Sequence, residues 1–399
     1  FSLPRTKDAT PTPLNLGPIC LLHPVAKCWT KLLVHRLPEV DERKAKTQMG
    51  FTPGRGVRDA TVCKQMVKDR IELGGSGWVT TSYDVSNAFP KTSFNAQRSV
   101  LAGGTRAEEL LRVDLANARM LVEAYNEQRT WYFRSGIKQG DVSGPELFRR
   151  VIVEVGDRIG ERRRDADLWV CDAEGNVVDV GTTWYADDLE RVLRVPQGMP
   201  IQEELARAEN DQRIVEEELG AAGLQLNQDK QETTLNFTGK GGVRRTKDRI
   251  ASSKGGLSEV RGRIVVLGRW TGPAVRRGEL EERARRMRGR FRQFKQCLTS
   301  RHVFKRVKRA LFFGLLLSTL LWDLEASCLT QDDVKYLNKE MHKILRVMTG
   351  PRALIVENEE YERMSNCEIR QFWRVPTVGK MLRVRRMKWL RSALARSDS

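Results

Sequence analysis

The chain has 399 residues, of which 40% are hydrophobic and 30% are charged. This length and composition predict about two or three globular domains, and they exclude both a disulfide-stapled miniprotein and a membrane bundle. The 70 Lys and Arg residues outnumber the 51 Asp and Glu residues, which gives a formal net charge of +19. Such an excess favours binding to a polyanion, with nucleic acid the first candidate and an anionic membrane surface the second.

The seven cysteines are scattered without a C-x-x-C pair, and the four histidines are not spaced with them as a ligand set. This pattern predicts a reducing compartment and no structural zinc. The longest apolar run, residues 310–322, is shorter than the about 20 residues that span a bilayer, so we expect a buried helix and no membrane partner. Because the chain begins with Phe and shows no leader, we expect a fragment of a longer intracellular product.

The amino-terminal third begins with a Pro-rich lead, which we expect to be extended. Apolar periodicity then predicts helices over residues 23–37 and 58–73. Residues 78–85 alternate as a short buried strand does, which places Asp84 near the carboxyl end of that strand.

The remaining patterns predict a mixed α and β chain. We expect helices over residues 107–129, 142–164 and 201–222, strands or extended segments over 130–137, 168–171, 177–193, 224–237 and 262–270, and a Gly-rich linker over 239–256. From residue 279 onward the pattern is almost wholly helical, so we expect a domain boundary near residue 275.

Most of the positive charge lies in one segment. Residues 241–310 contain 22 Lys and Arg against 5 Asp and Glu, a net of +17 out of the total of +19. A solvated helix face is the simpler explanation, but few acids are interleaved to neutralise the run by i to i+4 pairing. We therefore expect this segment to bind phosphates, with a steep dependence on salt.

Three acids are the candidates for catalysis. Asp187 and Asp188 are adjacent between two β-rich stretches, where a hairpin turn is expected, although acids also suit turns for local reasons. If their strand lies beside the strand that ends at Asp84, the three carboxylates converge and raise one another's pKa values. Two divalent cations would relieve this repulsion, activate an attacking hydroxyl and stabilise a leaving pyrophosphate, which is the chemistry of nucleotidyl transfer.

Six short motifs occur in an order that is similar to that of reverse transcriptases, and in particular to those of non-LTR retrotransposons. They are Gln48-Met49-Gly50-Phe51 with Pro53-Gly54-Arg55, Tyr83-Asp84-Val85-Ser86-Asn87-Ala88-Phe89, Gly136-Ile137-Lys138-Gln139-Gly140-Asp141, Tyr185-Ala186-Asp187-Asp188, Gly223-Leu224-Gln225-Leu226-Asn227 with Lys230, and Val266-Leu267-Gly268. The carboxyl end, residues 382–390, resembles the R-R-x-x-W-L tail of that family. The resemblance covers nearly the whole chain.

The resemblance implies an α+β right-hand polymerase fold with an antiparallel palm sheet and a helical thumb. It divides the chain into fingers (1–80), a palm with fingers insertions and the Y-x-D-D hairpin (81–275), and a helical thumb with a basic carboxyl-terminal region (276–399). The implied activity is that of an RNA-directed DNA polymerase, which adds dNTPs to a primer 3′ hydroxyl. Its partners would be an RNA template and a DNA primer or target, in the nucleus or elsewhere inside the cell.

The resemblance also assigns roles to single residues. Asp84, Asp187 and Asp188 would be catalytic and, with the Val85 carbonyl, would hold two Mg²⁺ ions, with Mn²⁺ as an alternative. Nucleotide-binding roles fall to Phe89, Gln139, Gly140 and Lys230. Phe89 would exclude a ribose 2′ hydroxyl or else simply pack in the core, Gln139 and Gly140 could form only a helix-preceding turn, and Lys230 could be merely solvated. Nucleic-acid contacts are expected from Arg55, Arg283, Arg285, Arg286, Arg288 and Arg290.

One departure from the family pattern leaves an alternative open. Gly17 stands where the family usually carries an Arg that clamps the triphosphate. The alternative is a catalytically weak or dead scaffold that still binds nucleic acid. An RNA-copying RNA polymerase is a second alternative, and Phe89 argues against it.

Overall fold

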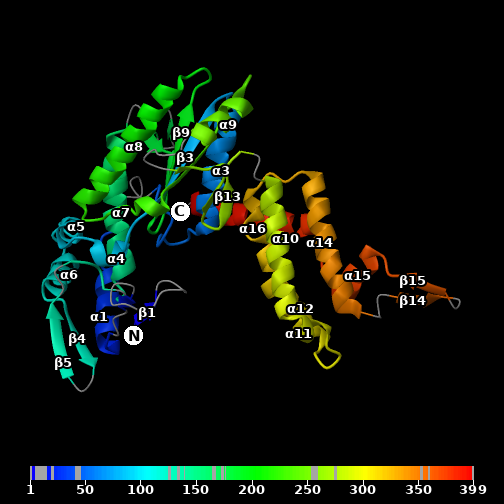
Figure 1. The fold of residues 1–399 in the computed structure, drawn as a ribbon. Coiled ribbons are helices and arrows are strands. Elements are labelled where there is room, and N and C mark those ends of the chain that lie inside the picture. The colour runs from blue at the N-terminus through cyan, green and yellow to red at the C-terminus, as the bar shows by residue number, and fades with distance from the viewer. Residues whose placement is uncertain are drawn as a thin grey trace. The chain divides into compact units, whose positions relative to one another are not determined.

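The structure is a computed structural model. It describes residues 2–4, 16–18, 22–40, 46–124, 127–132, 135–138, 140–163, 168–171, 175, 177–252, 259–273, 276–350, 354–357 and 360–397. The chain divides into two compact units, Phe1–Leu267 and Gly268–Ser399, which are described separately (Figure 1).

The first unit is built around a five-stranded sheet with the order β11-β10-β3-β9-β8. All its strand pairs are antiparallel except β10 with β11. The strands are β3 (Gly77–Asp84), β8 (Thr182–Tyr185), β9 (Asp188–Val195), β10 (Glu232–Asn236) and β11 (Glu259–Val260). The predicted strand over residues 78–85 is confirmed, and the long strand predicted over 177–193 is divided by turns.

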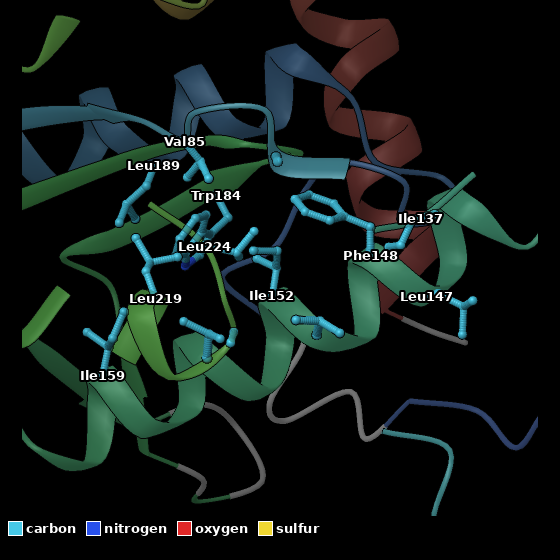
Figure 2. Close-up of a cluster of buried hydrophobic side chains, with 14 of the residues drawn as sticks. Val85, Ile137, Leu147, Phe148, Ile152, Ile159, Trp184, Leu189, Leu219 and Leu224 are labelled. Atoms are coloured by element: carbon cyan, nitrogen blue, oxygen red, sulfur yellow. The ribbon is translucent and has the colours of Figure 1, made fainter. Parts of the chain in front are cut away.

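The two faces of this sheet are covered by different helices, because successive side chains of a strand point to opposite faces. On one face, Trp184 and Leu189 pack against Ile152 of α7 (Gly144–Glu161) and Leu219 of α8 (Ile201–Ala221), as Figure 2 shows. These are the amphipathic helices that periodicity predicts over residues 142–164 and 201–222. The hydrophobic face of each helix forms the main core of the unit.

The opposite face is covered by α3 (Val57–Leu73), the helix expected over residues 58–73. Its Ile71 packs with Trp78 of β3 and Val192 of β9. The Lys68 ammonium lies 5.1 Å from the centre of the Trp78 ring. This helix therefore combines apolar packing with buried charge.

Two sequence predictions for the first unit are wrong. The helix expected over residues 107–129 ends early, because α6 stops at Ala116 and the antiparallel hairpin of β4 and β5 follows, extending away from the sheet in Figure 1. The linker expected over residues 239–256 contains α9, whose Thr246 side chain accepts a hydrogen bond from the Phe237 N–H. The other elements are β1 (Ser2–Pro4), β2 (Leu16–Pro18), α1 (Pro24–His35), α4 (Ala88–Lys91), α5 (Phe94–Ser99), α6 (Arg106–Ala116), β4 (Arg119–Ala124), β5 (Glu127–Tyr132), β6 (Trp169–Cys171), β7 (Val177–Asp179), η2 (Gln228–Lys230), α9 (Gly242–Ser252) and β12 (Ile264–Val266).

The second unit is mainly helical, as predicted. Its elements are β13 (Arg269–Thr271), α10 (Arg276–Gln293), α11 (Lys295–Thr299), α12 (Lys305–Leu311), the π-helical η3 (Phe312–Leu317), α13 (Ser318–Leu321), η4 (Leu324–Ala326), α14 (Gln331–Thr349), β14 (Leu354–Glu357), β15 (Glu360–Arg363), α15 (Asn366–Trp373) and α16 (Val378–Ser397). The β14–β15 hairpin interrupts the expected run of helices. Its core joins Met287 of α10, Leu316 of η3 and Leu345 of α14. The apolar run at 310–322 is thus buried along one side, whereas Trp322 at its end is 52% exposed. No helix among the described residues has the length and apolarity needed to cross a bilayer.

Candidate active site

Strand pairing brings the three candidate acids to one end of the five-stranded sheet. In the register of β3 with β9, Asp84 lies directly opposite Asp188. In the β8–β9 hairpin, Tyr185 lies opposite Asp188, so Ala186 and Asp187 form the turn. Opposite residues of an antiparallel pair have Cβ atoms about 4.5–5.5 Å apart. The two strands are thus the neighbours that convergence of the acids requires.

Burial and neighbouring acids raise the pKa values of Asp187 and Asp188. Burial raises the pKa of the Asp187 carboxyl, and the Asp84 carboxylate raises it further, while a backbone N–H and Lys230 act in the opposite direction. Burial also raises the pKa of the Asp188 carboxyl, with Asp187 as the next largest cause. Closely spaced, half-buried carboxylates favour either protonation or a bound cation.

Lys230 lies beside the first acid rather than free in solvent. Its Nζ is 3.3 Å from Oδ2 of Asp84, and the two side chains are 65% and 33% exposed. An ion pair this exposed contributes little stability. Breaking the ion pair between Lys230 and Asp84 therefore costs little free energy, so Lys230 can move to another charged group that enters the site.

The hairpin turn is clamped from behind by a residue to which the sequence reasoning gave no role. Gln48 is fully buried, and its Oε1 accepts hydrogen bonds from the N–H of Gly50 at 2.7 Å and of Ala186 at 3.2 Å. Its Nε2 donates to the Ala186 carbonyl at 3.3 Å. Ala186 has φ of 58°, a left-handed conformation that costs free energy for a residue with a Cβ. Gln48 thus stabilises the strained turn that presents Asp187.

The segment around Gln48 forms an isolated parallel bridge with Trp184 of β8. The Trp184 N–H donates to the Thr47 carbonyl, and the Met49 N–H donates to the Trp184 carbonyl, both at 2.8 Å. At Gly50 a Cβ would lie 2.1 Å from the Ala186 nitrogen, so only glycine permits this approach. The Q-x-G pattern itself was the available signal, but its partner lies more than 130 residues away in the chain.

Phe89 belongs to a small aromatic cluster with Phe51, of the Q-x-G-F motif, and Phe148 of α7. Its ring stacks on Phe148 with centroids 4.7 Å apart, and Phe51 meets it edge-on at 5.9 Å. Phe89 is half-buried, whereas Phe51 is 43% exposed. Packing against Phe148 and Phe51 fixes the position of the Phe89 ring, which remains partly exposed.

The glycine-rich segment expected to contact the nucleotide is joined to the Phe89 helix. The Ile137 N–H donates to the Phe89 carbonyl at 2.7 Å, and the Gly136 N–H donates to the Thr92 carbonyl at 2.8 Å. Gly140 is exposed with φ of 98°, and Gln139 lies outside the described residues. Asp141 precedes α7, where its Oδ1 accepts a hydrogen bond from the N–H of Ser143, the N-cap residue.

The segment of the G-L-x-x-N motif braces the first acid. The Asn227 N–H donates to the Asp84 carbonyl, and the Ser86 N–H donates to the Gln225 carbonyl, both at 2.8 Å. These bonds flank Val85, which pairs with Leu226 in an antiparallel bridge. The backbone at Asp84 is therefore held from both sides.

Comparison with protein families decides the relationship that these motifs suggest. Residues 11–337 match the family described as reverse transcriptase (RNA-dependent DNA polymerase). The chain belongs to the reverse transcriptase family. This family consists of RNA-directed DNA polymerases, which are nucleotidyltransferases, and the chain has the family's right-hand polymerase fold. A search of curated proteins finds no match.

Solved structures that resemble this reverse transcriptase include fungal telomerases. Telomerase from Candida albicans, in complex with a TWJ fragment of telomeric RNA, has a TM-score of 0.49 at 10% identity, over 89% of this chain and 59% of the telomerase chain. Apo telomerase from Candida tropicalis has a TM-score of 0.39 at 12% identity, over 81% and 53%. The chain thus spans little more than half of those telomerase chains.

The carboxylates of Asp84, Asp187 and Asp188 are chemically suited to bind a divalent metal ion. Carboxylate and carbonyl oxygens are the hard ligands that Mg²⁺ prefers. Yet no three His, Cys, Asp or Glu side chains within the described ranges are gathered into a metal-binding cluster, and Asp84 is paired with Lys230. Strand register places the acids together, and metal binding requires their side chains to turn toward one another.

The six arginines expected to contact nucleic acid are in different situations. Arg55 donates to the Lys46 carbonyl at 2.9 Å within its own loop. Arg283 is buried against Glu279 and the Trp322 carbonyl, and Arg288 pairs with Glu340. Exposed guanidinium groups remain at Arg285 and Arg286, which share Glu282, and at Arg290.

Proposed function

We propose that this reverse transcriptase is the polymerase part of a non-LTR retrotransposon protein, which adds dNTPs to a primer 3′ hydroxyl on an RNA template. The observation that carries the catalytic assignment is the strand register that sets Asp84 opposite Asp188, one residue from the Asp187 turn. The motifs outside the acids, above all the Q-x-G-F segment that clamps the turn, support the retrotransposon assignment.

The proposal divides the chain into fingers (1–80), palm (81–275) and thumb (276–399). Asp84, Asp187, Asp188 and the Val85 carbonyl would hold two Mg²⁺ ions, with Mn²⁺ as an alternative. When bound, the ions supply a lowered pKa for the primer 3′ hydroxyl and charge neutralisation for the pyrophosphate. The reaction needs nucleic acid and dNTPs, so we place it in the nucleus or elsewhere inside the cell.

The chain's own residues have separate tasks in this scheme. Lys230 would leave Asp84 for the triphosphate and donate a proton to the departing pyrophosphate. Phe89, fixed by Phe148, would exclude a ribose 2′ hydroxyl. The segment around Gln139 and Gly140 would contact the incoming nucleotide and the template base, and the exposed guanidinium groups of Arg285, Arg286 and Arg290 would contact phosphates.

The first test is primer extension on a primed RNA with dNTPs and Mg²⁺. We expect extension that EDTA abolishes and that Asp187→Asn reduces on the order of a thousandfold, since several kcal/mol of transition-state stabilisation would be lost. Asp229→Asn is the matched control, because Asp229 is an exposed carboxylate beside Lys230. Undiminished extension by Asp187→Asn would refute the site.

The second test concerns the choice of sugar. Phe89→Ala should raise the use of rNTPs relative to dNTPs by about tenfold or more, because a clash with the 2′ hydroxyl would be removed. Phe51→Ala opens the same aromatic cluster and serves as the control. If both variants relax the choice equally, looser packing rather than Phe89 itself explains the effect.

The alternative function is a nucleic-acid-binding scaffold with little or no turnover. Gly17, which pairs with Leu3 in the β1–β2 hairpin, supports it, since the family usually has an Arg at this position. The scaffold predicts salt-sensitive binding without extension, even in Gly17→Arg. A large gain in incorporation by Gly17→Arg would argue against it.

A further inference from the structure

The helical unit contains a cavity lined by basic side chains and lying among residues that have no part in the proposed chemistry. It has a volume of about 520 Å³ and lies between α14, α15 and the segment before α16. Five cationic residues and one histidine line it: Lys335, Lys339, Lys343, Arg346, Arg370 and His342. We call this cavity the basic groove. Among its described lining residues there is no Asp or Glu.

The charges of the basic groove form a row. Lys335, Lys339 and Lys343 follow one another at intervals of four residues along α14, and Arg346 comes three residues later, so all four share one helix face. Successive lysines are about 6 Å apart along the helix axis, and the whole row rises about 16 Å. Arg370 adds a charge from α15. A row of this length suits several successive phosphates of one strand.

Among the described residues, two acids pair with lysines of this row. Lys335 Nζ lies 3.0 Å from Asp332, but both side chains are largely exposed, so the pair is weak. Lys343 shares the buried Glu340 with Arg288. Lys339 forms no ion pair within the part of the chain that the structure describes. Like charges four residues apart on a helix destabilise it by a few tenths of a kcal/mol per pair, which a bound anion would relieve.

Two guanidinium groups of the groove are already fixed in place. Arg346 donates to the Met364 carbonyl at 3.0 Å and to Asn366 Oδ1 at 2.8 Å. Arg370 Nη1 lies 3.0 Å from Nε2 of His342, and because arginine only donates, this ring nitrogen must accept. Burial, Arg370 and Arg346 lower the pKa of His342 to about 4, in keeping with a neutral ring. Fixed guanidinium groups lose little conformational freedom when they bind an anion.

We propose that the basic groove binds the sugar-phosphate backbone of an RNA strand, as an attachment site separate in sequence from the acids of the palm sheet. The described lining residues of the basic groove include no apolar side chain, whereas membrane binding would require exposed apolar side chains among the lysines. RNA is the occupant we favour because this family copies RNA. The contact is with phosphates, so it carries no sequence preference.

Binding to the full chain tests this proposal without requiring catalysis. A fluorescein-labelled single-stranded RNA is titrated without primer or dNTPs, with wild type and with Lys335→Gln/Lys339→Gln. The matched control is Lys27→Gln/Lys31→Gln, which removes two exposed lysines at the same spacing from α1. Lys335→Arg/Lys339→Arg keeps the charge, and thermal melting confirms that each variant is folded.

We expect the groove variant to bind RNA about tenfold or more weakly at about 0.1 M salt, with a log–log salt slope shallower by about 1.4. The control should change little, and the arginine variant should bind as wild type does. Equal weakening by groove and control variants, or none by the groove variant, would overturn the proposal. So would a loss seen only with single-stranded DNA or with phosphatidylserine vesicles.

The same preparations separate this proposal from the proposed function. Primer extension by the groove variant at saturating RNA should approach that of wild type. If wild type did not extend a primer but the groove variant still bound RNA more weakly than wild type, the proposed activity would be contradicted. The proposal that the basic groove binds RNA would remain supported.

Discussion

Asp188 and Glu190 lie two residues apart on β9, on the same face of the sheet, and their charges are balanced in opposite ways. The Glu190 carboxylate has the ammonium groups of Lys64 and Lys68 at 2.7 Å on its two oxygens. Burial acts to raise its pKa, but the two lysines outweigh burial and lower it to about 2. At Asp188, burial and Asp187 prevail over Lys64, and the pKa is raised.

The difference separates a structural acid from a candidate catalytic one. Glu190 joins α3 to the sheet, because both of its lysines belong to that helix. Within the described part of the chain Asp188 forms no ion pair, and its nearest acidic neighbours are Asp187 and Asp84. A carboxylate that the protein does not neutralise is one that a substrate or cation can neutralise.

The largest effect on stability is expected from Glu190→Gln. This change leaves two buried ammonium groups without their carboxylate, so the free energy of unfolding should fall by about 3–5 kcal/mol. Denaturant unfolding measures it. Because the folded pKa of Glu190 is lowered, its stabilising contribution exists above the unfolded value of about 4.3 and disappears as the pH falls toward 2. If Glu190→Gln lowered the free energy of unfolding by less than about 1 kcal/mol, Glu190 would not be the structural acid that its contrast with Asp188 implies.

Asp188→Asn should give the reverse result. Removing a charge that burial and Asp187 disfavour should leave stability unchanged or slightly increased. Primer extension should fall about a hundredfold, equivalent to roughly 2.7 kcal/mol. A strongly destabilised Asp188→Asn protein would mean that this acid is structural as well.

The clamp behind the turn is tested by Gly50→Ala. The added Cβ would lie 2.1 Å from the Ala186 nitrogen, so the hairpin turn must shift, and we expect about tenfold slower extension with a loss of roughly 1–3 kcal/mol in stability. Gly220→Ala is the control, because nothing lies within 4 Å of a Cβ at that position. Equal activity of the two variants would show that the position of the turn does not matter.

The smallest expected effect is on the pH dependence of primer extension, at the acidic side of the pH–rate profile (the acid limb). Protonated carboxylates cannot hold a cation, so extension should fall with decreasing pH, starting above the ordinary Asp value of about 3.9, because the pKa values of Asp187 and Asp188 are raised. Cations compete with protons for the same oxygens, so tenfold more Mg²⁺ should move the limb by at most about one unit toward lower pH. A limb that is independent of Mg²⁺ would assign it to other groups.

Local patterns in the sequence predict the elements that local physics determines. Apolar periodicity locates α3, α7 and α8 to within a few residues, and alternation locates β3. Periodicity fails between residues 117 and 129, where an antiparallel hairpin follows α6. A strand owes its stability to cross-strand partners, which periodicity within one segment does not reveal.

The sequence motifs identify the acids of the site, but they do not predict the residues that hold these acids in place. Asp84, Asp187 and Asp188 stand in recognisable motifs, and the register that joins them follows once β3 and β9 are neighbours. The hydrogen bonds between Gln48 and Ala186 join residues 138 positions apart in the sequence. The pairing of Lys230 with Asp84 spans 146 positions, so only the fold shows it.

The most direct measurement of the central claim is Mn²⁺ binding followed by electron paramagnetic resonance, with wild type, Asp84→Asn, Asp187→Asn and Asp229→Asn. Asp84 and Asp187 come from separate strands that converge at the hairpin, so each of the first two changes should weaken Mn²⁺ binding at least tenfold, while Asp229→Asn should bind as wild type does. Unchanged Mn²⁺ binding by Asp84→Asn would contradict a shared cation site at this end of the sheet.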